Sequence, residues 1–133
     1  PYGVYTYLAT FDLAELVRGG VSSSNDRIAL ALEVIKAEWA KMADAGVTQA
    51  ELQAAKKYLT GAYPLRFDGN GRIAGILMGM QLDGMPVSYL ESRNARIEAV
   101  TVADVNRVAK RLMRPENLRI VVVGQPVGVV STD

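Results

Sequence analysis

The start of the chain has the residue pattern of two β-strands. Residues 2–11 are rich in Tyr, Val, Thr and Phe, which favour strands, and residues 16–22 form a second short run of this kind. Asp12 lies between the two runs and favours a turn. The pattern predicts an antiparallel pair of strands.

The next stretch has the spacing of an amphipathic helix. Its apolar residues recur at intervals of four, three, four and three: Ile28, Leu32, Ile35, Trp39 and Met42. Ser23, Ser24 and Asn25 precede it as N-cap candidates. Gly46 follows the stripe, so we expect the helix to end there.

Three further helix starts are predicted from capping boxes, in which a hydroxyl and an acid three residues later satisfy each other's backbone amides. The pairs are Thr48 with Glu51, Ser88 with Glu91, and the short-acid variant Thr101 with Asp104. Pro64 should kink or end the helix that begins at Thr48, because proline removes a backbone donor.

A further helix is predicted after the turn at residues 68–71. Its face is unusually apolar, with Ile73, Ile76, Leu77, Met80 and Leu82, so we expect it to be buried. We assign Met78, Met80 and Met85 to packing. The β-branched run at 118–123 is typical of a strand buried on both faces, and we expect it to return to the sheet.

These elements predict an α+β fold, with an antiparallel or mixed sheet and several helices packed on one face. The order is strand, strand, four or five helices, then strand. We expect one domain over residues 1–124, truncated at its N-terminal edge, and a tail or linker over 125–133.

The composition of the chain argues against several classes of function. The 133 residues carry a net charge of +1 without a basic run, which gives nucleic-acid binding no electrostatic support. No apolar stretch approaches the roughly 20 residues of a membrane span. The chain has no His and no Cys, so it cannot alone be a zinc, Ser/His/Asp or Cys/His enzyme of the usual kind.

Other candidate groups have simpler interpretations. The carboxylates Asp68, Asp83, Glu91 and Glu98 show no pairing and fit solvated or capping roles. The segment 69–71 precedes a helix but lacks the full phosphate-binding patterns, which favours a tight turn.

Three tyrosines lie in the first predicted strand. Tyr5 and Tyr7 share one face of the strand, whereas Tyr2 points to the other. A phenol can donate a hydrogen bond to a substrate carbonyl or a developing oxyanion. Cross-strand packing is the simpler role for these rings.

Several motifs in order resemble the C-terminal domain of M16 peptidases, the family of insulinase, pitrilysin and mitochondrial processing peptidase. They are Tyr-Gly-Val at 2–4, Gly-Val-Thr-Gln-Ala-Glu-Leu at 46–52, Glu-Ala-Val-Thr-Val-Ala-Asp-Val at 98–105, Arg-Pro-Glu-Asn-Leu at 114–118 and Val-Val-Val-Gly at 121–124. The resemblance covers about residues 2–124, and the order and spacing of the motifs carry it.

The resemblance implies a LuxS/MPP-like domain of a zinc metallopeptidase. Zinc would be held by an HxxEH motif in an N-terminal domain or separate subunit, and this chain would form a wall of the peptide-binding chamber without binding a cofactor or metal itself. The family's C-terminal domain contributes an Arg and Tyr pair that contacts the substrate. Tyr2 matches the Tyr and is the accessory catalytic candidate, while the Arg would fall before Pro1.

The implied partners are a zinc-bearing M16 domain or subunit, arranged as a homo- or heterodimer, and an extended peptide substrate. Bacterial members of the family are often exported, which favours the periplasm. Two alternatives remain. The chain could be a catalytically inactive scaffold or assembly protein of the same fold, as in the core subunits of respiratory complex III, or a small ligand-binding domain with its own closed pocket.

Overall fold

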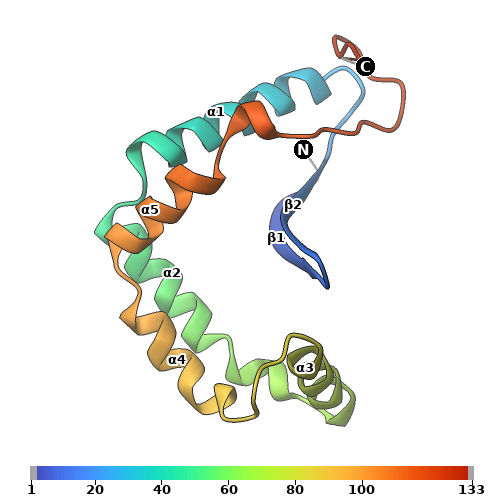
Figure 1. The fold of residues 1–133 in the computed structure, drawn as a ribbon. Helices are drawn as coiled ribbons and strands as arrows, with labels where there is room; N and C mark the ends of the chain where they lie inside the picture. The colour runs from blue at the N-terminus through green and yellow to red at the C-terminus, as the bar shows by residue number, and fades with distance from the viewer. Residues whose placement is uncertain (1–2, 132–133) are drawn as a thin grey trace. The chain divides into compact units, whose positions relative to one another are not determined.

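A computed structural model describes residues 3–131 and has α+β secondary structure (Figure 1). The described elements, in chain order, are β1 (Gly3–Phe11), β2 (Ala14–Ser22), α1 (Ile28–Ala45), α2 (Gln49–Gly61), the 3₁₀ helix η1 (Pro64–Phe67), α3 (Asn70–Leu82), α4 (Tyr89–Ala99), α5 (Val102–Leu112) and the 3₁₀ helix η2 (Pro115–Asn117). The chain divides into two compact units, one of Pro1–Asp44 with Lys110–Asp133 and one of Ala45–Ala109.

Strands β1 and β2 form the predicted antiparallel hairpin. Val4 pairs with Val21, Tyr5 with Gly20 and Tyr7 with Arg18. Because side chains alternate across a strand, Tyr5, Tyr7 and Arg18 share one face, and Val4 and Val21 share the other.

The hairpin has no buried residue on either face. Its exposed large apolar side chains are Val4, Tyr5, Tyr7, Leu8, Phe11, Leu13 and Leu16. Within the unit that contains the hairpin, α1 buries neither face of the hairpin, and the packing of the other helices on the sheet stays a prediction. A two-stranded sheet offers little apolar area, and three or more strands or a packed helix are needed to make it a stable layer.

The predicted return of residues 118–123 to the sheet is wrong. In the described residues the sheet contains β1 and β2 alone, and 118–123 carries no strand assignment. Val121 is 88% exposed and Val123 is 94% exposed. A β-branched run favours extended backbone but becomes a strand only where a neighbouring strand accepts its hydrogen bonds.

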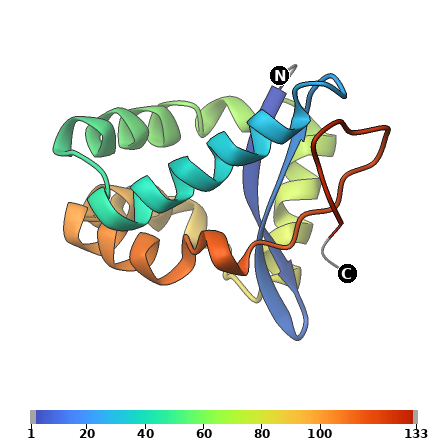
Figure 2. The same ribbon diagram turned by 90° about the horizontal axis from the view of Figure 1, so that it is seen from above.

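The segment after 118–123 runs past the beginning of α1, as its red trace shows in Figures 1 and 2. Val127 N donates a hydrogen bond to Asn25 O at 2.8 Å. A Cβ on Gly128 would lie 3.4 Å from the Cβ of Ala29, so this part of the tail lies close to the first turn of α1.

The second unit begins with the turn that ends α1. Gly46 has φ of +67°, a left-handed conformation that favours glycine. Next to it, Val47 N donates to Asn106 Oδ1 at 2.9 Å, which ties this turn to α5. A side chain on Gly46 would overlap the Asn106 amide, so the site requires glycine for space as well as for conformation.

Two of the three predicted capping boxes are confirmed. At α2, Glu51 N donates to Thr48 Oγ1 at 3.2 Å and Thr48 N donates to Glu51 Oε2 at 2.8 Å. At α5, Asp104 N donates to Thr101 Oγ1 at 3.2 Å and Thr101 N donates to Asp104 Oδ2 at 3.1 Å. Both helices therefore begin where the sequence predicts.

The third predicted box, Ser88 with Glu91, is not formed. Ser88 has helical dihedral angles and makes no side-chain capping bond. Two hydrogen bonds fold residues 86–90 into consecutive tight turns. Tyr89 N donates to Pro86 O at 2.9 Å, and Leu90 N donates to Val87 O at 3.0 Å. An N-cap residue needs extended backbone, and this turn denies it to Ser88.

Helices α2 and α4 contact each other in the second unit (Figure 1). Lys56 Nζ, on α2, donates to Glu98 O near the end of α4 at 2.6 Å. Arg93 Nη1, on α4, donates to Leu59 O near the end of α2 at 3.2 Å. Each helix thus supplies a cation to the carbonyl end of the other, where the helix dipole favours positive charge.

The buried apolar residues are few: Ile28, Leu52, Tyr63, Met80 and Ala109. Tyr63 packs edge-on against Phe67 of η1, with ring centroids 5.2 Å apart, and the Arg93 guanidinium lies 3.9 Å from its ring centroid. Lys56 is also buried, at 7% exposure, with its ammonium on the Glu98 carbonyl. The contacts of Tyr63 and Lys56 therefore link α2, η1 and α4.

The prediction that α3 is buried is wrong. Met80 is its one buried residue, while Met78 is exposed and Leu82 is 80% exposed. Met80 therefore has the packing role expected of it and Met78 does not. Within its own unit, helix α3 contacts η1. Hydrophobicity alone cannot bury a helix unless another element covers it.

Candidate functional site

The candidate site predicted from the sequence centres on Tyr2, which lies outside the described residues. Strand β1 begins directly after it, at Gly3. The other two tyrosines are described. Tyr5 and Tyr7 stack on one face of β1, with ring centroids 6.2 Å apart and planes 24° apart.

The Tyr5 ring also covers Gly20 on the neighbouring strand. A Cβ at Gly20 would lie 2.8 Å from Tyr5 Oη and 3.0 Å from its Cζ. Glycine therefore leaves room for the ring across the strand pair. This contact and the stacking on Tyr7 match the cross-strand packing role for these residues.

The carboxylates singled out in the sequence lie apart. Asp68 faces Arg72 at 3.9 Å on the surface, and Asp83 caps the end of α3. Glu91 lies in the first turn of α4, and the backbone carbonyl of Glu98 accepts the Lys56 bond. No three acidic residues come together as a candidate metal site within the described part of the chain.

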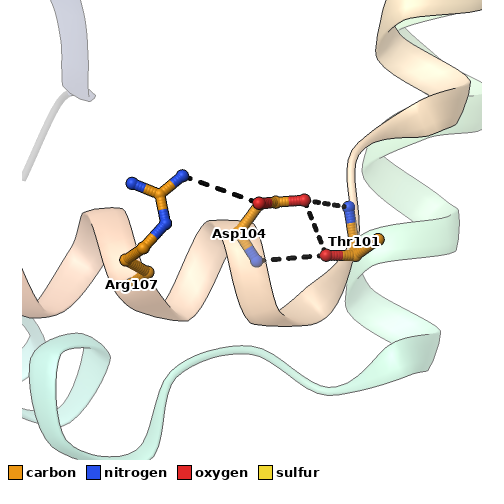
Figure 3. Close-up of polar contacts among 3 residues, drawn as sticks. All are labelled: Thr101, Asp104 and Arg107. Atoms are coloured by element: carbon orange, nitrogen blue, oxygen red, sulfur yellow. Dashed lines mark hydrogen bonds and ion pairs between the residues drawn. The ribbon is translucent and has the colours of Figure 1, made fainter.

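Two other carboxylates have perturbed acidity, and both are exposed. At Asp104 the Thr101 hydroxyl and then the Thr101 backbone amide hold the pKa below its ordinary value of 3.8, with a smaller contribution from Arg107 (Figure 3). The guanidinium Nη2 of Arg107 lies 3.5 Å from Asp104 Oδ1. At Asp26 a hydrogen bond with Ser24 lowers the pKa most. These are helix-capping and turn interactions, and neither forms a cleft.

The described residues also form a groove of about 270 Å³, which is not among the sites predicted from the sequence. It lies between the open end of the hairpin and the first half of α1. Its lining residues are Val4, Val21, Ser23, Arg27, Leu30, Ala31, Val34 and Ile35. Six of the eight are apolar, and the two polar residues, Ser23 and Arg27, precede α1 in the chain.

A sequence signal for this groove existed. The helix residues that line it fall at positions 27, 30, 31, 34 and 35, which is the i, i+3, i+4, i+7, i+8 spacing of one helix face. The stripe chosen from the sequence shares only Ile35 with this face. The predicted stripe is confirmed as the less exposed face of α1, since Ile28 is buried and its other members are partly buried. The groove lies along a neighbouring, more exposed face that is also apolar, because apolar residues surround much of α1.

Comparison with known proteins gives no match: no protein-family model, curated protein or solved structure is significantly similar to this chain. Among residues 3–131, no helix combines the length and apolar character that crossing a bilayer requires.

Proposed function

We propose that this chain is the non-catalytic C-terminal domain of an M16-type zinc metallopeptidase. It would form a wall of the peptide-binding chamber and help to orient the substrate, while another domain or subunit carries out zinc-dependent hydrolysis. The order and spacing of the motifs over residues 2–124 motivate the proposal.

The observation that carries the proposal is the exposed hairpin. Both faces of β1 and β2 present large apolar side chains, including Leu8 and Phe11, and none is buried. Exposed apolar surface of this kind marks a place where another element packs. A further sheet or domain of the peptidase would supply that cover, while Val4 and Val21 at the open end of the hairpin still line the groove beside α1.

Zinc does not fit the residues of this chain. Zinc sites use His and Cys far more than carboxylates alone, and the sequence contains neither. The described carboxylates form no cluster. The metal, its activated water and the general base must therefore come from the HxxEH-bearing partner.

The first test is peptidase activity. The intact protein that carries this chain should be assayed alone and mixed with an HxxEH-bearing M16 homologue, with and without a zinc chelator. We expect chelator-sensitive cleavage of an extended peptide in at least one combination. No cleavage in any combination, with both proteins folded and zinc-loaded, would overturn the proposal and favour a scaffold or assembly protein.

In the active combination, Tyr2→Phe tests the accessory role. If the phenol donates a hydrogen bond to the substrate carbonyl, removing its hydroxyl should lower kcat/KM by about 10- to 100-fold, with little change in stability. Tyr58→Phe, at an exposed position of α2, is the matched control and should leave the kinetics unchanged. Equal kinetics for the two variants would exclude Tyr2 from the site.

A further inference from the structure

The groove between the hairpin and α1 has mostly apolar walls and one cationic lining residue, Arg27. Val4 and Val21 pair across the hairpin and form one wall, while Leu30 and Val34 on α1 belong to the other. Leu30 and Val34 are both exposed, so an entering ligand can reach them from solvent.

Arg27 gives this groove its charge. No acidic residue lines the groove, and no carboxylate in the described part of the chain forms an ion pair with Arg27. The neighbouring Asp26 is hydrogen-bonded to Ser24, which lowers the pKa of Asp26 most, and the charge of Arg27 makes the smallest contribution to that lowering. The first turn of α1 carries no acidic residue either, so its positive dipole end adds to the charge of Arg27.

A ligand complementary to this groove has an apolar body and an anionic end. Guanidinium binds carboxylate with two parallel hydrogen bonds, and the Ser23 hydroxyl is a further donor among the lining residues. A volume of about 270 Å³ lies below the usual range for a drug-sized ligand and suits one or two side chains.

We propose that the groove binds the C-terminal residue of a peptide, with an apolar side chain between Val4, Val21, Leu30 and Val34 and the terminal carboxylate on Arg27. The choice of a peptide over other carboxylates rests on the proposed function. The groove would then hold the free end of a bound peptide or product.

The test is calorimetric titration of the 133-residue chain, without zinc or partner. The probes are a pentapeptide ending in leucine with a free carboxylate, the same peptide as its C-terminal amide, and dodecanoate. We expect the free acid to bind at least about tenfold more tightly than the amide, because the amide loses a charge-assisted pair with Arg27.

Arg27→Gln should weaken binding of the free acid by about tenfold or more and leave the amide unaffected. The matched control is Arg18→Gln, the same charge change on the opposite face of the hairpin, which should leave both affinities within about twofold. Val34→Asp places a carboxylate in the groove and should abolish binding of the acid.

The inference would be overturned by equal binding of acid and amide, by equal effects of Arg27→Gln and Arg18→Gln, or by binding of dodecanoate without the peptide. Absence of any binding by a folded chain would also overturn it. Because the titration needs no zinc, peptide binding with no peptidase activity would leave the groove assignment standing while the proposed function failed.

Discussion

The unit Ala45–Ala109 and the β1–β2 hairpin differ in which groups pair with their backbone N–H and C=O groups. In the former, side chains satisfy helix ends, as Thr48 does for α2 and Lys56 does for α4. In the hairpin the strands satisfy only each other, and neither is buried. A helix completes its hydrogen bonds locally, whereas a sheet edge needs a further chain segment.

The largest expected effect comes from replacing the same residue type in the two regions. Tyr63 is 9% exposed and Tyr5 is 63% exposed. Tyr63→Ala should destabilise the chain by about 3–5 kcal/mol, since it removes the ring between Phe67 and Arg93. Tyr5→Ala should cost less than about 1 kcal/mol.

Urea unfolding followed by circular dichroism measures both variants. Equal losses would show that the hairpin is covered in solution and that the contrast between the two regions is incorrect.

Gly46→Ala should have the next largest effect. A residue with a β-carbon loses roughly 1–2 kcal/mol in the left-handed conformation of Gly46, and displacing Asn106 also removes its hydrogen bond to Val47. The free energy of unfolding should therefore fall by about 2–3 kcal/mol in total. Gly61→Ala is the control, because a Cβ there meets nothing within 4 Å. Thermal unfolding should show it unchanged or slightly stabilised. A Gly46→Ala chain as stable as Gly61→Ala would contradict the geometry of this turn.

Removing one capping hydroxyl should have the smallest effect. Thr48→Ala and Thr101→Ala should each lose about 1 kcal/mol of stability. Ser88→Ala should lose almost none, since Ser88 makes no capping bond. Chemical denaturation measures the loss of unfolding free energy in each variant. A loss for Ser88→Ala equal to that for Thr48→Ala would show that the Ser88–Glu91 capping box forms in solution.

The same substitution at Thr101 has a pH signature. The folded pKa of Asp104 lies below its ordinary 3.8, so its contribution is present above pH 3.8 and is lost as pH falls through the lowered pKa. In Thr101→Ala the pKa of Asp104 should rise toward 3.8, because its main hydrogen-bond donor is gone. Carboxyl ¹³C titration by NMR measures the change, and an unaltered pKa would mean that another group sets it.

Local sequence patterns correctly predict the hairpin and the starts of α2 and α5. The capping motifs at Thr48 and Thr101 act within four residues, so their chemistry is visible in the sequence itself. At Ser88 the motif was present, but the preceding proline turn fixed a backbone conformation that a cap cannot use. The groove was missed because its walls come from two elements, with Arg27 on one and Val4 on the other.

The sequence by itself determined the hairpin followed by the helices, the starts of α2 and α5 at their capping boxes, and the absence of His and Cys. The tertiary structure alone decided which apolar residues are covered. In it, most of α3 and Val121 are exposed. Lys56 is buried, and its ammonium donates a hydrogen bond to the Glu98 carbonyl near the end of α4. Burial depends on what another element brings alongside, and that is a property of the assembled chain that no local pattern encodes.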